Sequence, residues 1–332
     1  MLAYIARRLV LLIPVVFVIS IVVFLIIQLP PGDYLTTYIE NLRTSGIEVS
    51  ASQAESLKRM YGLDQPIYTQ YFIWMKNMIL NGDFGRSFQW NKPVKEILLE
   101  RIPLTMGVSL ATTLFVFLLA IPIGIYSATH KYSPFDYAFT FVGFIGLSVP
   151  GFLLALVLMW GIYNLTGATV SGLFSAQYAD APWNLAKFGN LLSRIWFPMI
   201  IIGMSGTAGL IRVMRGNLLD ELQKQYVVTA RAKGVPERTV LFRYPVRIAV
   251  NPIISTIGWI LPSIVGGEVL VSIVLNLQTT GPVLLQAVRF QDMYLAGSIT
   301  LLLSILTIVG TLIADILLVW LDPRIRFGKV GE

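Results

Sequence analysis

The chain has 332 residues, of which 55% are apolar and only 13% are charged, with a net charge of +7 and a mean hydropathy of +0.72. These values exclude an ordinary soluble domain and indicate an integral membrane protein. The absence of cysteine excludes disulfides and thiolate metal sites, and the single histidine, His130, excludes a cluster of histidine ligands.

Long apolar runs recur along the chain, and several reach the roughly 18 to 20 residues that a helix needs to cross about 30 Å of hydrocarbon. We predict six transmembrane helices, at about residues 9–29, 104–128, 138–163, 195–211, 248–275 and 295–320. The runs are continuously apolar, without the alternation of a membrane-barrel strand, so the predicted fold class is all-α. The first run is too long for the core of a cleavable signal, and no small-x-small cleavage pattern follows it.

The distribution of Lys and Arg predicts the orientation. Arg7 and Arg8 precede the first run and predict a cytoplasmic N-terminus. With six spans, segments 129–137 and 212–247 and the C-terminus are also cytoplasmic, and these inner segments carry more than half of the 25 basic residues. The net positive charge is therefore a topology signal. The inner segments are expected to contact anionic membrane lipid. Binding to nucleic acid is not expected, because the sequence shows no folded basic face.

The predicted organisation has three parts. Residues 1–29 form a short cytoplasmic segment and the first transmembrane helix, 30–103 form an extracytoplasmic helical region, and 104–332 form a core of five transmembrane helices. Within the second part, Ser52 and Glu55 make a capping-box pattern for a helix that ends at Gly62.

A second extracytoplasmic helix is predicted after Pro66. Apolar residues recur there at helical spacing until Asn81 and Gly82 end the run. The members of this stripe are Ile67, Tyr71, Trp74, Met75, Met78 and Ile79. We predict that the stripe packs on the outer face of the bundle, and the alternative is a docking surface for an extracytoplasmic partner.

Residues 218–233 of the cytoplasmic segment carry the signals of a helix. Asn217 is a suitable N-cap, acidic residues follow in the first turn, and basic residues occupy the last turn, so the charges complement the helix dipole. Gly234 suits the left-handed residue that follows a helix. Tyr226, Ala230 and Gly234 recur every four residues and are predicted to share a face that another surface can approach closely. An ordinary solvated connector is the alternative.

The stretch Thr229-Ala-Arg-Ala-Lys-Gly234 resembles the EAA loop of type I ABC importer permeases, in the form found in dipeptide and oligopeptide permeases. Further motifs resemble the first permease member of that group. They are Arg7-Arg8 with Pro31-Gly-Asp33, Gly62-Leu-Asp-Gln-Pro66, Gly82-Asp-Phe-Gly85, Ser148-Val-Pro150 and Asp322-Pro-Arg-Ile-Arg326. Because the motifs cover nearly the whole chain, the protein is identified as a member of this family.

The resemblance implies the type I permease fold and one of the two membrane subunits of an ATP-driven importer in a bacterial or archaeal plasma membrane. The implied partners are a second permease subunit in a heterodimer, two ATP-binding subunits or domains, and an extracytoplasmic solute-binding protein. Residues 218–234 would be the coupling helix, which rests in a groove of an ATP-binding subunit. Its implied contact residues are Tyr226, Val228, Thr229, Ala230, Arg231, Lys233 and Gly234. Val228 stands where the wider family often has glutamate.

The chain has no G-x-x-x-x-G-K-[ST] phosphate loop. We therefore expect that it is not an enzyme and binds no cofactor, and that ATP and Mg²⁺ are bound by the partner subunits. Closure of the ATPase pair is expected to move the coupling helix as a rigid body. The spans would then rock between inward-open and outward-open states.

Four residues are predicted to line the translocation pathway: Ser148, Pro150, Glu268 and Ser272. Glu268 follows Pro252 by enough residues to place it about 24 Å further along a helix, in the outer half of the fifth span. An intramembrane carboxylate by default faces a cavity or a partner. A water-filled pathway and a structural hydrogen bond or ion pair both stay open for it.

Peptides are the leading substrate class, and oligosaccharides are the runner-up because residues 266–282 differ from the usual peptide-permease pattern. A secondary transporter coupled to H⁺ or Na⁺ often shows inverted repeats, whereas this chain offers Glu268 and Asp315 and no repeat. An intramembrane enzyme would need a nucleophile and a base or a metal pair, and a single loop histidine without cysteine argues against both. The count of aspartates leaves a diaspartyl protease open, but Asp315 is the only aspartate in the predicted spans, which argues against it. A receptor or channel requires that residues 218–234 bind something other than a motor.

Overall fold

The structure is a computed structural model that describes residues 2–28, 56, 64–87, 89–256 and 269–321. Its elements form two compact units. The first comprises Met1–Thr105 and Thr279–Leu306, and the second comprises Met106–Gln278 and Thr307–Glu332. The predicted division into 1–29, 30–103 and 104–332 concerns placement relative to a membrane and stays a prediction.

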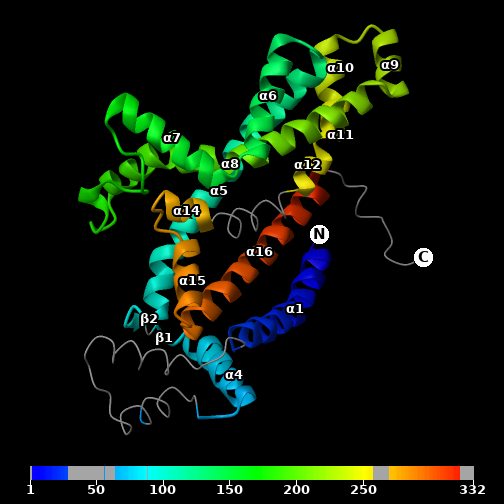
Figure 1. Cartoon of the computed structure of the whole chain (residues 1–332). Coiled ribbons are helices and arrows are strands. Elements are labelled where there is room, and N and C mark those ends of the chain that lie inside the picture. The colour runs from blue at the N-terminus through cyan, green and yellow to red at the C-terminus, as the bar shows by residue number, and fades with distance from the viewer. Residues whose placement is uncertain (1, 29–55, 57–63, 88, 257–268, 322–332) are drawn as a thin grey trace. The chain divides into compact units, whose positions relative to one another are not determined.

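The first unit is mainly helical. In chain order it contains α1 (Leu2–Gln28), α4 (Ile67–Lys76), the π-helix η1 (Asn77–Asn81), strands β1 (Arg86–Ser87) and β2 (Lys92–Pro93), the start of α5 (Val94–Thr129), α15 (Thr280–Arg289) and the first half of α16 (Met293–Leu321) (Figure 1). The two strands pair antiparallel, with Arg86 opposite Pro93. They form a short hairpin that leads directly into α5.

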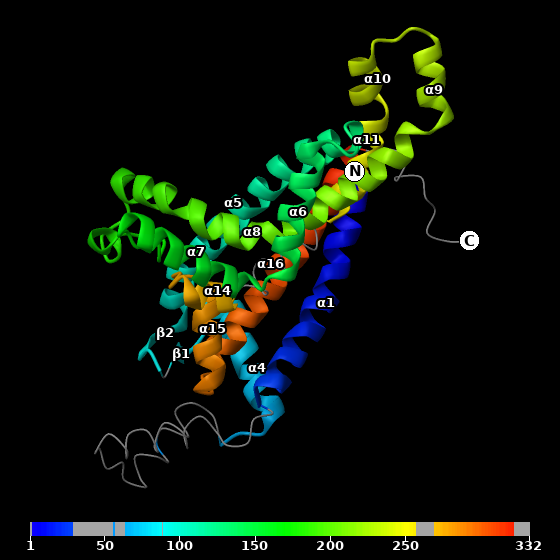
Figure 2. The ribbon, with the colours of Figure 1, turned by 45° about the horizontal axis from the view of Figure 1, so that its top comes forward.

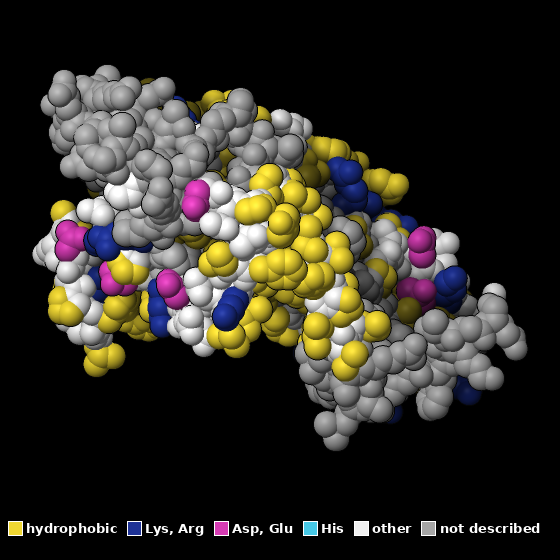
Figure 3. Space-filling model, turned by 90° about the horizontal axis from the view of Figure 1, so that it is seen from below, with side chains coloured by type: hydrophobic (Ala, Val, Ile, Leu, Met, Phe, Trp, Pro, Cys, Tyr) yellow, Lys and Arg dark blue, Asp and Glu magenta, His cyan; other side chains and the backbone are white. Residues whose placement is uncertain are grey.

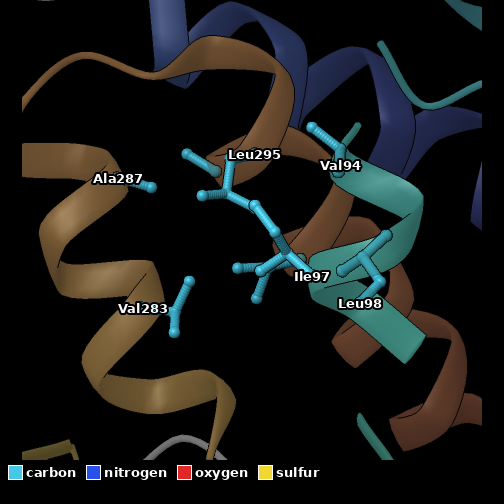
Figure 4. Close-up of a cluster of buried hydrophobic side chains, with 8 residues drawn as sticks. Val94, Ile97, Leu98, Val283, Ala287 and Leu295 are labelled. Atoms are coloured by element: carbon cyan, nitrogen blue, oxygen red, sulfur yellow. The ribbon is translucent and has the colours of Figure 1, made fainter. Parts of the chain in front are cut away.

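The core of the first unit joins α5, α15 and α16, whose apolar side chains point toward one another (Figure 4). The buried members are Val94, Ile97, Leu98, Val283, Ala287, Leu295, Ala296 and Ile299. A polar contact adds to this packing, because Thr105 Oγ1 on α5 accepts the backbone N–H of Thr280 at 2.9 Å. The first turn of α15 is thereby anchored to α5.

Asp292 holds the corner between α15 and α16. Gln291 adopts the left-handed conformation (φ 56°), and the Asp292 N–H donates back to the Ala287 carbonyl at 2.7 Å, which closes α15 in a Schellman motif. The buried Asp292 carboxylate then caps α16 by accepting the Leu295 N–H at 3.2 Å, and its other oxygen accepts the Ser87 hydroxyl at 2.5 Å. One side chain therefore joins the hairpin to the start of α16.

The predicted helix after Pro66 is confirmed as α4 and η1, which end at Gly82 (φ 60°). Tyr71 and Trp74 are buried, with their rings 5.4 and 5.8 Å from that of Phe24 on α1. The hydroxyl groups of Tyr71 and Ser20 share a hydrogen bond of 2.7 Å. The middle of the predicted stripe therefore packs on α1, while its two ends, Ile67 and Ile79, lie exposed. The predicted helix between Ser52 and Gly62 lies outside the described residues.

The second unit contains the remaining elements. They are the rest of α5, α6 (Pro134–Ser148), α7 (Gly151–Thr166), the 3₁₀ turn η2 (Ala176–Tyr178), α8 (Leu185–Leu222), α9 (Gln225–Ala232), α10 (Glu237–Arg243), α11 (Pro245–Ala249), α12 (Asn251–Ser255), α14 (Val269–Val274) and the second half of α16. α6 packs along α8, and α9 and α10 stand side by side next to the end of α8 (Figures 1 and 2).

α5 and α8 approach each other closely at Gly124. Their shared core includes Val116 and Met214, both almost completely buried. A Cβ atom at Gly124 would lie 2.6 Å from the Cβ of Met214 and 3.3 Å from the Ile211 carbonyl oxygen. Real Cβ atoms do not approach this closely, so the contact requires glycine.

Replacing Gly124 with alanine is therefore expected to destabilise the protein by about 1–3 kcal/mol, because the added methyl group forces α5 and α8 apart. The matched control is Gly107→Ala on the same helix, where a Cβ would meet nothing within 4 Å. There the higher helix propensity of alanine is expected to be neutral or to stabilise by up to about 1 kcal/mol. Thermal unfolding of the two purified variants in detergent measures the difference, and equal melting temperatures would contradict the close approach.

Among the described residues, three helices are long and apolar enough to cross a membrane: Val94–Thr129, Leu185–Leu222 and Met293–Ile313. α6 and α7 supply a fourth candidate if the bent pair is one span, and the apolar part of α1, Val10–Ile26, is shorter. Hydrophobic side chains cover much of the described surface on the face shown in Figure 3. A mostly helical membrane fold is therefore confirmed. The count of six spans stays a prediction, and part of the predicted span 248–275 lies outside the described residues.

The prediction of one continuous helix over 138–163 is wrong. α6 ends at Ser148 and α7 begins at Gly151, and their axes differ by 112°. Pro150 explains the break, because a proline ring disfavours the helical conformation of the residue before it. Val149 is accordingly extended, with φ −92° and ψ 124°.

Candidate functional site

The predicted coupling segment forms two helices, so the prediction of one helix over 218–233 is wrong at its start. α8 continues through Asn217 to Leu222, and α9 begins only at Gln225. The cap signal at Asn217 is overridden by packing, because Leu218 is fully buried against α5 and α12 residues, and the Asn217 side-chain amide instead lies 3.5 Å from the Ala249 carbonyl oxygen.

α9 buries one narrow face against α10. Val227 and Val240 are both fully buried, and Ala230 is 8% exposed, with Val235 packed against them. The surface that approaches Ala230 is thus α10 of the same chain, and the predicted contact of Ala230 with an ATP-binding subunit stays a prediction. Because the side chain of Ala230 is small, α10 can pack closely against α9 at this position. Val227 and Val240 are not among the predicted site residues. The signal for them is that valines lie on both sides of a Gly-Val-Pro turn, a pattern that suits a packed helical hairpin.

The predicted end of the helix at Gly234 is confirmed. Gly234 is left-handed (φ 75°), its N–H donates to the Arg231 carbonyl at 2.9 Å, and the Val235 N–H donates to the Ala230 carbonyl at 3.3 Å. These two bonds form a Schellman motif, and the contact of Val235 with Ala230 supplies its usual hydrophobic partner. A Cβ at Gly234 would meet nothing within 4 Å, so only the backbone conformation selects glycine.

The opposite side of α9 is open. Five of the seven predicted contact residues are exposed on α9 and at its C-cap, namely Tyr226, Val228, Thr229, Arg231 and Lys233, and Gly234 is exposed just beyond them. The structure therefore presents six of the seven on the surface of a single hairpin. This surface is mixed in character, with two cationic groups, a hydroxyl, an aromatic ring and an apolar side chain.

Two polar contacts order this surface. Arg231 Nε donates to Glu237 Oε2 at 3.0 Å, and this hydrogen bond holds the pKa of the Glu237 carboxyl below its ordinary value. Because both side chains are largely exposed, the pair orients Arg231 more than it stabilises the hairpin. The Tyr226 hydroxyl donates to Glu221 on α8, and burial followed by this contact raises the pKa of Tyr226. Tyr226 stays protonated at neutral pH and tethers α9 to the end of α8.

The predicted pathway residues are only partly brought together. Ser148 and Pro150 are exposed at the bend between α6 and α7. Ser272 is buried on α14, which packs on α7, and a Cβ at Gly151 would lie 3.2 Å from the Val271 side chain. The bend and α14 are therefore neighbours. Glu268 lies outside the described residues, and its predicted place in the pathway stays a prediction.

Comparison with known proteins shows which family the chain is similar to. Residues 120–327 match the family described as binding-protein-dependent transport system inner membrane component, and residues 1–111 match its N-terminal family. The chain is 34% identical to the oligopeptide transport system permease protein AppB of Bacillus subtilis, over 98% of this chain and 100% of that protein. It is 28% identical to the dipeptide transport system permease protein DppB of Alkalihalophilus pseudofirmus, over 98% and 100% of the two chains. For DppB of Lactococcus lactis the identity is 29%, again over 98% and 100%.

Both family matches together span nearly the whole chain, and residues 120–327 include α9 and α10. The family resemblance predicted from the motifs is therefore confirmed. The chain belongs to the family of inner-membrane components of binding-protein-dependent transport systems.

Proposed function

We propose that this protein is a permease subunit of an ATP-driven peptide importer, that it forms half of the translocation pathway, and that α9 is its coupling helix. The observation that carries the proposal is the α9–α10 hairpin, defined here as residues 225–243. It presents predicted contact residues on the open side of a helix whose other side is buried. A solvated connector would not need this internal core.

The hairpin is built to transmit force. Only two residues, Gln223 and Lys224, separate α9 from the 38-residue α8. The α9–α10 core and the Tyr226–Glu221 contact oppose rotation of α9 about this short connection. A push on the open side of α9 is therefore passed to α8 as a rigid-body movement, which is the way that packed helices commonly transmit displacement.

Peptides are the proposed substrate class because the similar proteins are named as oligopeptide and dipeptide permeases. The oligosaccharide alternative and the ion-coupled transporter have no comparable support. The proposed partners are a second permease subunit, two ATP-binding subunits that hold ATP and Mg²⁺, and an extracytoplasmic solute-binding protein. We place six spans in the plasma membrane of a bacterium or archaeon, with both termini cytoplasmic, and assign no catalytic role to this chain.

A cross-linking experiment tests the coupling role in the assembled complex. The chain has no cysteine, so Val228→Cys places a single thiol on the open side of α9. We expect it to cross-link to the ATP-binding subunit, and the yield to change with nucleotide. Val227→Cys is the matched control, because the adjacent side chain is fully buried and should not react. Peptide transport by the purified chain alone, or no cross-link at Val228 in an active complex, would overturn the proposal.

A further inference from the structure

The second unit contains a cavity that the coupling hypothesis does not use. It lies between the segment after α7 and the second to fourth turns of α8, and its volume is about 340 Å³. Its walls include Ser175, Asn190, Ser193, Arg194, Trp196 and Phe197. This volume falls in the range of about 300–1,000 Å³ that is typical of small-molecule sites.

The polar part of the cavity wall offers mostly donors. Arg194 donates one N–H to the Ser171 carbonyl at 3.0 Å and forms no ion pair with any other residue that the structure describes. Asn190 uses its side-chain oxygen to accept the Ser175 N–H at 2.9 Å, which leaves its NH₂ group as a donor. The Ser175 hydroxyl is buried and has no hydrogen-bond partner among the described residues. A buried hydroxyl without a partner is costly and calls for an acceptor.

The wall formed by the segment after α7 is held in place. The buried Lys187 ammonium donates to the Ala181 carbonyl at 2.6 Å and lies 4.9 Å from the ring of Phe174 and 5.3 Å from that of Trp183. The Gly172 N–H donates to the Leu275 carbonyl at 2.7 Å. Cation–π contacts and backbone hydrogen bonds therefore fix the cavity before any ligand arrives.

We infer that this cavity binds the terminal carboxylate of a peptide together with the apolar residue next to it. Arg194 supplies a positive charge and a planar set of donors that fits a carboxylate. Ser175 and Asn190 supply further donors, and the rings of Trp196 and Phe197 supply an apolar wall. A neutral oligosaccharide has no charge to match Arg194. The inference rests on the proposed function, because it makes the cavity a peptide subsite of the same importer.

Protection of a thiol tests the inference in the assembled transporter. Ser193→Cys places a single reporter thiol of this chain in the cavity wall, where residue 193 is exposed. The probe is the tripeptide alanyl-alanyl-phenylalanine, and its carboxamide is the matched control ligand. We expect the free acid to slow maleimide labelling of the permease band several-fold and the carboxamide to have no effect.

Two further substitutions identify the groups that bind. Arg194→Gln in the reporter background is expected to abolish the protection. Ser175→Ala is expected to weaken the protection and to leave the contact of Arg194 with Ser171 intact. The inference can therefore be tested even if Arg194→Gln does not fold. Equal protection by the carboxamide, equal protection by sulfate at the same ionic strength, or full protection in Arg194→Gln would overturn the inference. So would protection by the solute-binding protein without peptide combined with none by free peptide.

Protection of the thiol does not depend on ATP hydrolysis by the importer. Stimulation of ATPase activity by the peptide-loaded binding protein tests the proposed function in the same preparation. Protection without stimulation would sink the proposed function and leave carboxylate binding in the cavity standing. Stimulation without protection would sink the cavity inference alone.

Discussion

Replacing Val227 with aspartate is expected to abolish peptide uptake by the assembled importer while the chain still inserts into the membrane. Val227 is fully buried between α9 and α10 and has only apolar neighbours in that small core. Burying a carboxylate there without a partner costs several kcal/mol, which such a small core cannot offset. The hairpin therefore opens and α9 no longer moves with α8. Uptake into proteoliposomes measures the loss, and faster tryptic cleavage near Arg231 reports the opening.

Gln225→Asp is the matched control, since it introduces the same acid two residues earlier on the same helix. Gln225 is exposed and is not among the predicted contact residues, so the new carboxylate stays solvated and the hairpin stays closed. We expect uptake to be largely retained. Normal uptake by Val227→Asp, or the same loss in both variants, would show that the buried face of α9 does not matter for coupling.

The end of α9 was predictable from sequence, and its start was not. The end depends on Gly234, whose left-handed backbone is a property of that residue and its immediate neighbours. The start depends on Leu218, which is buried against residues distant in sequence, and this tertiary packing continues α8 through a good local cap. Tertiary contacts routinely override such local preferences.

The contrast between local signals and tertiary packing also explains the other predictions. The helix after Pro66 and its termination at Gly82 follow from spacing and a turn residue, and both were predicted. The break between α6 and α7 has a local signal, which is Pro150 itself, but the long apolar run favoured the prediction of one continuous helix. The burial of Ala230 could not be predicted, because four-residue spacing shows which side chains share a face but not what covers that face.

A long-range ion pair was also beyond sequence reasoning. Asp136, in the first turn of α6, is 4% exposed and accepts two hydrogen bonds from Arg215 on α8, with Nε–Oδ1 and Nη2–Oδ2 distances of 3.2 and 3.1 Å. The Tyr132 N–H adds a third hydrogen bond at 3.0 Å. Residues 79 positions apart are thus joined by a bidentate contact, and nothing in the local pattern of either segment indicates it.

Replacing Arg215 with methionine is expected to lower the free energy of unfolding by about 3 kcal/mol, because it leaves the Asp136 carboxylate buried without its counter-charge. Adding Asp136→Asn is expected to recover most of this loss, since the amide oxygen can still accept the Tyr132 N–H and no charge remains. Denaturant titration in detergent measures both values. The control is Arg212→Met, one turn earlier on α8. Arg212 is exposed 5.6 Å from the ring of Phe144, a contact worth about 0.5–1 kcal/mol.

The double variant also separates stability from coupling. Arg215 lies about 10 Å along α8 from the end that leads to α9. A movement of that end would therefore reach α6 through the ion pair of Arg215 with Asp136. Packing of α6 on α8 persists without the charges, because Gly146 and Gly143 lie directly against Met204 and Ala208. If packing transmits the movement, the stable double variant transports peptide at a normal rate. A double variant that folds with full stability and still fails to transport would show that the ion pair itself carries the displacement, and that interdigitation of the two helices is not enough.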